Sequence, residues 1–224
     1  MTQTQHRADH ELEAAIIDEL AWTPSVDARE IGVTVTDGAA TLSGNVGTYP
    51  ESEEALRAAT RVHGVTVTAG EIVVRHAADA PADDDLAREA AIVFDRRTVV
   101  VPKGSVRVEV TDRVITLRGT VDWQFQREAA RHAMATLPGV SGIRNLITLN
   151  AATLVPPAET QGRIKAALHR HAAPEAPHIE VDVTGSHVTL SGTVSSSAER
   201  RAAEQAAWFA AGVTAVDNQV TLSG

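Results

Sequence analysis

The chain carries one sequence pattern three times, and this repetition limits its fold more than any other feature. Three segments begin with Thr and end in Thr-Leu-Ser-Gly or Thr-Leu-Arg-Gly, namely residues 36–44, 111–119 and 184–192. Their last residues lie 75 and 73 positions apart, and a Gly-Val pair follows each of them 20 residues later. Repetition at a nearly fixed period is typical of one structural unit used several times. The 224 residues therefore indicate three copies of a module of about 65 residues.

Within one copy, the hydrophobic pattern changes from that of strands to that of a helix. Ile31–Val35 alternates β-branched residues with polar ones, which indicates a half-buried strand, and a tight turn and a second alternating strand follow. Ala55 and Ala58 then mark one face of a helix. Third strands are expected near residues 71–74, 143–149 and 216–222, and weaker amphipathic helices before each copy near 12–20, 86–93 and 164–168.

This order predicts an α+β fold made of three tandem α-β-β-α-β modules. A strand–helix–strand crossover normally returns the last strand parallel to the second strand. Each module should therefore be a three-stranded mixed sheet with two helices packed on one face. Two short linkers rich in Ala and Pro place the expected modules at residues 8–76, 83–150 and 158–224.

Two sets of glycines recur at equivalent positions, and both are interpreted as structural. The first set interrupts the second strand, where a missing side chain allows a bulge or a close approach of the backbone: Gly44, Gly119 and Gly192. The second set follows the helix, where glycine suits a C-cap in the left-handed conformation: Gly64, Gly139 and Gly212.

Taken together, these features resemble the BON domain, which is named after bacterial osmotically inducible and nodulation proteins. The resemblance lies in Thr-Leu-Ser-Gly-x-Val, in the Ala-rich helix, and in an ending with Asn145 and Asn218 in the second and third copies. The first copy departs from it, with Gly70 at that position. The segments 22–28 and 121–130 are also similar to modules of bacterial stress proteins with three BON domains. The resemblance covers nearly the whole chain.

The resemblance implies a bacterial, non-catalytic binding protein. Members of the family are associated with osmotic and envelope stress and with phospholipid binding, and some cytoplasmic relatives are linked to potassium. Many members are exported.

Composition excludes several classes of protein. The absence of Cys rules out disulfide scaffolds, iron–sulfur clusters, Cys-type zinc sites and a cysteine nucleophile. The first ten residues contain no apolar stretch like that of a secretory signal, and no segment approaches the roughly 18 apolar residues of a membrane span. A cytoplasmic location is therefore expected. The common nucleotide-binding, serine-hydrolase and metalloprotease motifs are missing, so we expect no enzyme and no cofactor.

Charge is distributed unevenly along the chain. The first module has 12 acidic and 4 basic residues and a net charge of −8, whereas the second has a net charge of +1 and the third of −2. The whole chain has a net charge of −9. Binding to nucleic acid needs clustered Lys and Arg to neutralise phosphates, so no nucleic-acid partner is expected.

The helix that follows the second strand starts differently in the middle module. The first and third copies offer capping boxes, Thr48-x-x-Glu51 and Ser196-x-x-Glu199. The aligned position of the second copy is Trp123, so Asp122 is expected to cap the helix one residue earlier. Departures from a local rule are expected at functional sites.

The same helix start supplies the candidate contact site. Trp123 and Phe125 stand beside Arg127 and Arg131. The aromatic rings would anchor an apolar group, and the arginines would complement an anionic lipid headgroup or a protein partner. The alternative is that both rings simply pack on a neighbouring module.

The remaining polar candidates are weaker. His178 and His187 are expected on facing strands, but without Cys a closed metal site would need carboxylates, so no metal is expected. The acidic run Asp83–Asp85 is interpreted as a helix N-terminus. Asn145 and Asn218 are interpreted as turn residues or as satisfied hydrogen-bonding groups.

Three functions follow as hypotheses. The first is recognition of phospholipid headgroups or a protein partner during osmotic or envelope stress, chiefly through the middle module. The second is binding of potassium or a small ligand at backbone carbonyls near a module junction. The third is a chaperone-like scaffold that binds partly unfolded chains.

Overall fold

A computed structural model of the chain describes most of the sequence. The described residues are 3–65, 67–76, 80–150, 156–171, 179–194 and 196–222.

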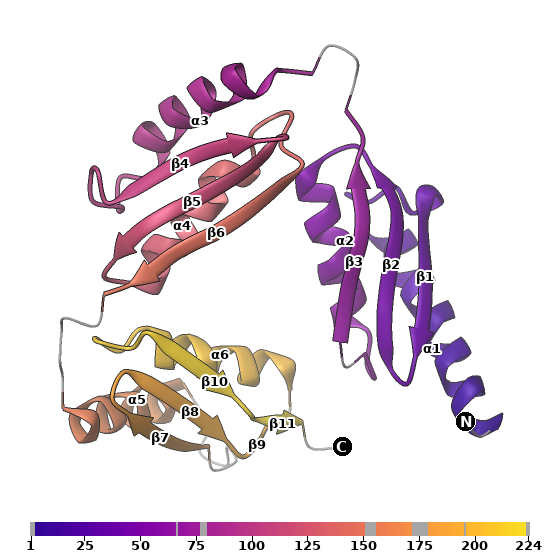
Figure 1. Ribbon diagram of the computed structural model, residues 1–224. Coiled ribbons are helices and arrows are strands. Elements are labelled where there is room, and N and C mark those ends of the chain that lie inside the picture. Colours follow the sequence, from indigo (N-terminus) through magenta and orange to yellow (C-terminus); the bar gives the residue numbers. More distant parts are fainter. Residues whose placement is uncertain are drawn as a thin grey trace. The chain divides into compact units, whose positions relative to one another are not determined.

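The first module has the predicted order of elements (Figure 1). Its elements are α1 (Gln3–Trp22), a short 3-10 helix η1 (Ala28–Glu30), β1 (Ile31–Thr36), β2 (Ala39–Val46), α2 (Tyr49–Arg61) and β3 (Val67–Val74). The sheet order is β1-β2-β3. β1 pairs antiparallel with β2, with Val33 opposite Leu42, and β3 pairs parallel with β2, with Gly70 opposite Leu42. The mixed sheet and the parallel third strand confirm the prediction.

The core of this module lies between the sheet and its two helices. Ile16 and Leu20 of α1 and Leu42 of β2 are almost fully buried, as are Ala55 and Ala58 of α2. The small alanine side chains let α2 approach the sheet closely while still removing apolar surface from water. The predicted alanine stripe is therefore the face that packs.

The second and third modules repeat this order. The second contains α3 (Asp83–Arg97), β4 (Val106–Thr111), β5 (Val114–Val121), α4 (Gln124–Ala135) and β6 (Gly142–Leu149). The third contains α5 (Pro157–His171), β7 (Glu180–Thr184), β8 (His187–Ser191), β9 (Thr193–Val194), α6 (Ser197–Trp208), β10 (Ala215–Asn218) and β11 (Thr221–Leu222). The three-stranded sheets have the orders β4-β5-β6 and β10-β8-β7. The α+β class with three tandem units is confirmed.

One strand prediction is wrong in detail. The expected third strand near residues 216–222 is divided into β10 and β11, which pair parallel with β8 and β9 respectively. Backbone bonds nevertheless continue across the gap, because the N–H of Gln219 donates to the carbonyl of Leu190 at 2.9 Å and that of Thr221 donates to the carbonyl of Gly192 at 3.0 Å.

An aspartate of the first helix holds the strand turn in two of the modules. In the first module both oxygens of Asp9 accept from the backbone N–H groups of Asp37 and Gly38, each at 3.1 Å. In the second, Asp83 accepts in the same way from Asp112 and Arg113, at 2.7 and 2.9 Å. These bonds stabilise left-handed backbone at non-glycine residues, since Asp112 has a φ of 51° and Arg113 a φ of 61°.

The glycines of the second strand lie against backbone, as predicted. A Cβ added at Gly44 would stand 2.0 Å from the carbonyl oxygen of Glu30, and one added at Gly119 would stand 2.0 Å from that of Ser105. Gly192 also has a positive φ, of 126°. Only glycine allows the first two strands to approach so closely at this point.

The glycines after the helix are correctly predicted in conformation but not in place. Gly64, Gly139 and Gly212 have φ values of 96°, 87° and 81°. They lie three or four residues beyond the last helical residue, however, and not at a helix C-cap. A separate turn follows each helix: the N–H of Val65 donates to the carbonyl of Val62, which places Gly64 at the third turn position. That position favours glycine when its φ is positive.

Asparagines at equivalent positions of the second and third modules connect the third strand to the preceding helix. Nδ2 of Asn145 donates to the carbonyl of Arg127 at 3.1 Å, and Nδ2 of Asn218 donates to that of Arg200 at 3.2 Å. Their interpretation as satisfied hydrogen-bonding groups is confirmed. In the first module the position is Gly70, and the side chain of Leu56 lies 3.1 Å from where a Cβ would stand. An apolar contact replaces the polar one there.

Candidate functional site

The candidate contact site lies where β5 ends and α4 begins. Trp123 is the last residue before α4, and Phe125 is its second residue. Their rings stack with centroids 6.3 Å apart and an angle of 27° between the planes. Phe125 remains 45% exposed, and Trp123 is half-buried. The structure therefore joins the two predicted aromatic residues in one stacked pair, of which Phe125 is the exposed member.

Gln126 fixes this helix start, which the sequence did not predict. The backbone N–H groups of Asp122 and Trp123 both donate to Oε1 of Gln126 at 3.1 Å. The expected cap by Asp122 is wrong, because Oδ1 of Asp122 accepts instead from Nδ2 of Asn150 at 3.2 Å. The side-chain amide of the third residue of α4 thus accepts from the two backbone N–H groups that directly precede the helix.

Gln126 also connects the aromatic pair to a second exposed segment. Its Nε2 donates to the carbonyl of Val100 at 2.9 Å, and its side chain is only 8% exposed. Val99 is 87% exposed and Val100 is 50% exposed. Neither valine was among the contact residues predicted from the sequence. We call Val99, Val100, Trp123 and Phe125 the apolar tip of the middle module.

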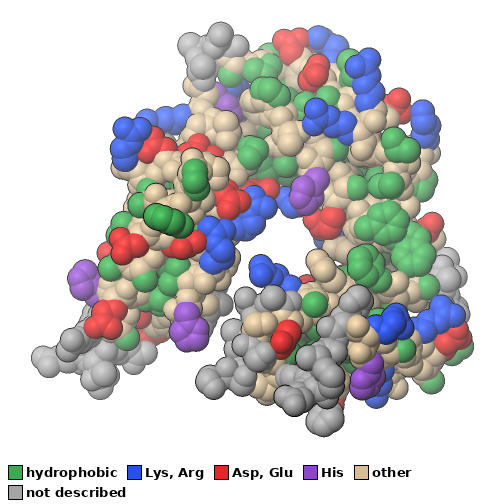
Figure 2. All heavy atoms as spheres, turned by 180° about the vertical axis from the view of Figure 1, so that it is seen from behind, with side chains coloured by type: hydrophobic (Ala, Val, Ile, Leu, Met, Phe, Trp, Pro, Cys, Tyr) green, Lys and Arg blue, Asp and Glu red, His purple; other side chains and the backbone are tan. Residues whose placement is uncertain are grey.

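A tight turn holds the two valines outward. The N–H of Val101 donates to the carbonyl of Thr98 at 2.9 Å, and both of these residues are buried. The turn is anchored at its ends, so the residues between them face solvent. Figure 2 shows one side of the molecule, with hydrophobic side chains reaching the surface among acidic and basic ones.

The two predicted arginines have different surroundings. Nε of Arg127 is buried and, together with Oε1 of Gln124, has no hydrogen-bond partner among the described side chains. A buried guanidinium donor without a partner costs free energy unless a ligand or water supplies an acceptor. Arg131 instead forms an ion pair with the carboxylate of Glu53, and both side chains are largely buried. Arg131 is thus engaged by an acidic side chain, whereas the buried Nε of Arg127 is not engaged by a described group.

The matching helix starts of the other modules are capped by hydroxyl groups. The N–H of Glu51 donates to Oγ1 of Thr48 at 3.3 Å, and that of Glu199 donates to Oγ of Ser196 at 3.2 Å. Both predicted caps are confirmed. The middle module alone combines an aromatic residue at this position with a glutamine three residues later.

The first module exposes a tryptophan in a more acidic setting. Trp22 is 82% exposed and lines a groove together with Glu19, Glu54 and Arg61. Arg61 donates to both carboxylates, at 2.8 Å to Glu19 and 3.2 Å to Glu54. Its charge is therefore already neutralised within the module, which distinguishes this groove from the apolar tip.

The structure gives little support to other sites. Among the described residues, no three His, Asp or Glu side chains lie close enough together to hold a metal ion. His178 lies outside the described residues. Asp83 is engaged with the turn of the second hairpin. No helix in the part of the chain that is described is long and apolar enough to cross a membrane.

Structural neighbours are distant. The C-terminal domain of CdsD, a structural protein of the type III secretion system of Chlamydia trachomatis, is 15% identical, with 96% of this chain and 98% of that chain covered and a TM-score of 0.27. The periplasmic domain of PrgH from S. typhimurium is 13% identical, with 88% and 95% covered and a TM-score of 0.22.

Sequence relatives are more informative. Osmotically-inducible protein Y of Escherichia coli (strain K12) is 30% identical over 143 residues, which are 60% of this chain and 67% of that protein. A family model of the BON domain matches residues 8–76, 83–151 and 158–224. These matches leave only short segments of the chain uncovered, so the chain belongs to the BON-domain family as a protein with three tandem BON domains.

Proposed function

We propose that this chain is a non-catalytic binding protein of osmotic or envelope stress, and that it attaches to anionic phospholipid surfaces through the apolar tip of its middle module. The observation that carries the proposal is the exposed pair Val99 and Val100 beside the stacked rings of Trp123, which is half-buried, and Phe125, which is exposed, with Gln126 bonded to both segments. The link to osmotic stress rests on the similarity to Osmotically-inducible protein Y.

The energetics of the apolar tip suit a reversible attachment. Full burial of one Val or Phe side chain contributes about 1.5–3 kcal/mol, so partial burial of four such side chains contributes a few kcal/mol. A cation near an anionic leaflet adds about 1 kcal/mol, and Lys103 and Arg127 follow the two segments of the apolar tip a few residues later in the sequence. Neither contribution alone holds a protein on a membrane, so binding should need both.

The charge of the modules favours the middle one. The first module exposes Trp22 beside Glu19 and Glu54 and has a net charge of −8, which an anionic surface repels. The middle module has a net charge of +1. We therefore propose that exposed aromatic surface in the first module does not bind anionic lipid.

Liposome flotation tests the proposal. The purified chain is mixed with vesicles of phosphatidylcholine alone or with about one third phosphatidylglycerol, at about 50 and about 150 mM salt, where screening differs clearly. We expect flotation with the anionic vesicles that is weaker at the higher salt. Trp123→Ala/Phe125→Ala should reduce the bound fraction at least fivefold.

A matched control uses the other exposed tryptophan. Trp22→Ala should leave flotation unchanged, since Trp22 lies in the acidic groove of the first module. Equal loss in both variants, or no flotation of the parent chain with any vesicle, would contradict the proposal. In the second case, equal thermal melting in KCl and NaCl would further argue against potassium binding, and suppression of client aggregation would favour a scaffold.

Two further expectations stay predictions. The three ranges 8–76, 83–150 and 158–224 are proposed as the folding units of the chain, which limited proteolysis at the two linkers would test. The cytoplasmic location expected from the N-terminal composition is tested by fractionation of the native host.

A further inference from the structure

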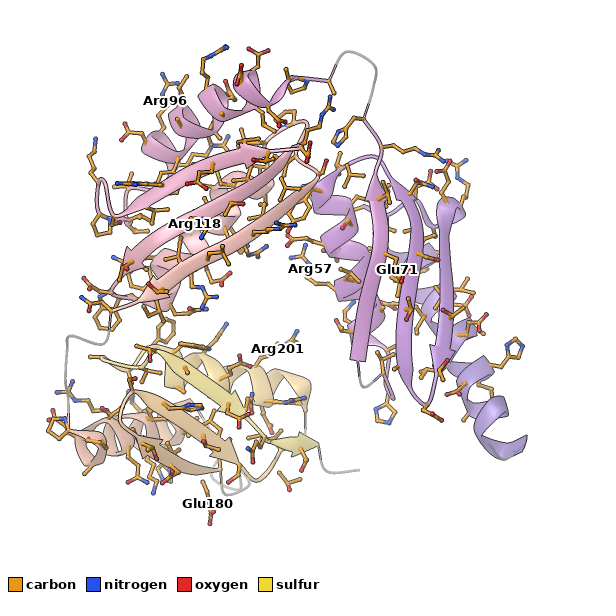
Figure 3. All side chains as sticks on the ribbon, viewed as in Figure 1. Arg57, Glu71, Arg96, Arg118, Glu180 and Arg201 are labelled. Atoms are coloured by element: carbon orange, nitrogen blue, oxygen red, sulfur yellow. The ribbon has the colours of Figure 1, made fainter. Side chains whose placement is uncertain are left out.

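The three sheets leave one face uncovered by helices, and these faces differ in charge. In each three-stranded sheet, buried positions alternate with exposed ones, and the exposed set forms the open face. Figure 3 labels one charged residue of each sheet: Glu71 on β3, Arg118 on β5 and Glu180 on β7. The charge of the face therefore changes from module to module.

The open face of the middle sheet is basic. Arg107 of β4 and Arg118 of β5 occupy exposed strand positions. One further acidic and one further basic residue stand at exposed positions of this sheet, Glu109 and Arg144, and their charges cancel. Leu146 adds an apolar side chain that is about half exposed. This face thus has a net charge of +2 around an apolar residue.

The open face of the third sheet is acidic. Glu180, Asp182 and Asp217 occupy exposed positions of β7 and β10. Strand pairing places Asp182 and Asp217 on either side of Thr189, so that both carboxylates flank one strand of the face. No Lys or Arg stands at a described position of β7, β8 or β10. The three carboxylates give this face a formal charge of −3.

We propose that a second copy of this chain is the partner of these faces: the basic sheet face of the middle module in one copy docks on the acidic sheet face of the third module in another. The two faces are opposite in charge and similar in construction, each being three strands wide and rich in Thr. Opposite charges steer such an encounter and fix its orientation. Each contact joins two different surfaces, so it can occur twice in a reciprocal dimer or repeat head to tail along a chain of copies.

The size of the faces makes the contact weak and sensitive to salt. Three strands about 4.8 Å apart and about six residues long give a face of roughly 300 Å². Stable complexes bury about 800 Å² per partner, so one such contact produces a transient complex. In a reciprocal dimer the contact forms twice. In an open-ended assembly of many copies it forms once for each copy. Both assemblies depend on the same pair of faces.

Sedimentation velocity tests the proposal with the full chain. At about 50 mM salt, where screening is weak, we expect the weight-average sedimentation coefficient to rise with protein concentration from about 1 to 100 µM, and this rise should vanish at about 500 mM salt. Arg107→Glu/Arg118→Glu should weaken association at least tenfold, as should Glu180→Arg/Asp182→Arg. A parent chain that stays monomeric at every concentration in low salt would overturn the proposal.

Mixing the two variants separates contacts between copies from contacts within one copy. The first variant has two acidic faces and the second has two basic faces, so each should be monomeric alone while the mixture associates again. Failure of the mixture to associate, with both variants folded by circular dichroism, would overturn the proposal. Recovery also shows that both variants are folded.

A control and a milder variant complete the test. Arg96→Glu/Arg201→Glu changes the net charge by the same amount on exposed helix positions of the same two modules, α3 and α6, and should leave association unchanged. If Arg107→Glu/Arg118→Glu unfolds the middle module, Arg107→Gln/Arg118→Gln removes the positive charge without adding a negative one. That variant should still weaken association at least threefold, and unchanged association would overturn the proposal.

Discussion

The first and middle modules begin their second helix with different chemistry on the same backbone plan. In the first, Thr48 caps the helix and Glu51 accepts from the N–H of Gly47 at 2.9 Å. In the middle module, Gln126 stands at the position of Glu51 and accepts from two backbone N–H groups, while Trp123 stands at the position of Thr48. Gln126 therefore keeps the role of Glu51, whereas the role of the Thr48 hydroxyl is not taken over by a side chain: the N–H of Gln126 donates to the backbone carbonyl of Trp123 at 3.1 Å. The comparison teaches that this helix start can form without a capping side chain at the N-cap, where the middle module carries a half-buried aromatic ring.

Glu51 and Gln126 also form hydrogen bonds with the loop before the first strand of their own module. Glu51 is the acceptor of its bond, and Gln126 is the donor of its bond. Glu51 accepts from the N–H of Asp27 at 2.8 Å, whereas Gln126 donates to the carbonyl of Val100 at 2.9 Å. An amide can both accept at the helix start and donate to the loop, whereas the carboxylate of Glu51 can only accept. The glutamine is therefore what allows the middle module to present Val100 and Trp123 together.

The largest effect is expected from a substitution at Gly119. In the first and middle modules, the strand that leads to the second helix needs a glycine at this position. Gly119→Ala would place a Cβ 2.0 Å from the carbonyl oxygen of Ser105, at a φ of 149° that alanine rarely adopts. The strand before α4 must then move, and we expect a loss of about 3 kcal/mol or more in the free energy of unfolding. Chemical denaturation measures this loss.

A second glycine serves as the control. Gly104 also has a positive φ, of 77°, but nothing lies within 4 Å of its added Cβ. Gly104→Ala should therefore cost only about 1 kcal/mol, from backbone conformation alone. Equal losses for the two substitutions would show that the close approach at Gly119 does not limit the fold.

The next effect tests the glutamine itself. Gln126→Ala leaves the N–H groups of Asp122 and Trp123 without their acceptor in a largely buried place, and should reduce the free energy of unfolding by about 2–3 kcal/mol. Gln126→Glu keeps the acceptor but not the donor to Val100, and should cost less. A thermal or urea melt of both variants gives the order. If the glutamate variant were the less stable one, the bond to Val100 would be the stronger support.

A substitution that restores the cap of the first module should have a smaller effect of opposite sign, a gain in stability. Trp123→Thr restores the hydroxyl found at Thr48, and we expect helix α4 to gain up to about 1 kcal/mol. The same variant should lose flotation with anionic vesicles, because one ring of the apolar tip is gone. Denaturant melts and flotation are measured on the same preparation. A variant that is less stable and still floats would contradict the view that capping is given up for binding.

The sequence predicts the fold well because most of its determinants are local. The alternation in Ile31–Val35, the hydroxyl of Thr48 and the missing side chain of Gly119 each act on their own stretch of backbone. The prediction fails where two residues compete for one role, as Asp122 and Gln126 do at the start of α4. Both can accept from backbone N–H groups, and only the folded geometry decides between them.

The two valines of the apolar tip were missed for a different reason. An apolar residue in a sequence is expected to be buried, and exposure depends on the turn that Thr98 and Val101 make. A signal was nevertheless present. The first module has Pro24 and Ser25 where the middle module has Val99 and Val100, and only the comparison of copies shows that this turn does not need apolar residues.

The smallest effect concerns the tyrosine that begins α2, whose counterpart in α4 is Gln124. Burial, and then the charge of Glu53, whose carboxylate accepts from its hydroxyl at 3.0 Å, raise the pKa of Tyr49 to about 12. Because this pKa lies above the ordinary value of about 10, the stability contributed by neutral Tyr49 is fully present below pH 10 and is lost as the pH rises through 12.

The chain has a single tyrosine, so the phenolate absorbance near 295 nm reports this group alone. Glu53→Gln should move the midpoint of the titration downward but not back to its ordinary value, since burial remains as the main cause. A midpoint at the ordinary value in the parent chain would mean that the start of α2 is open to water. The two helix starts would then differ in packing as well as in capping.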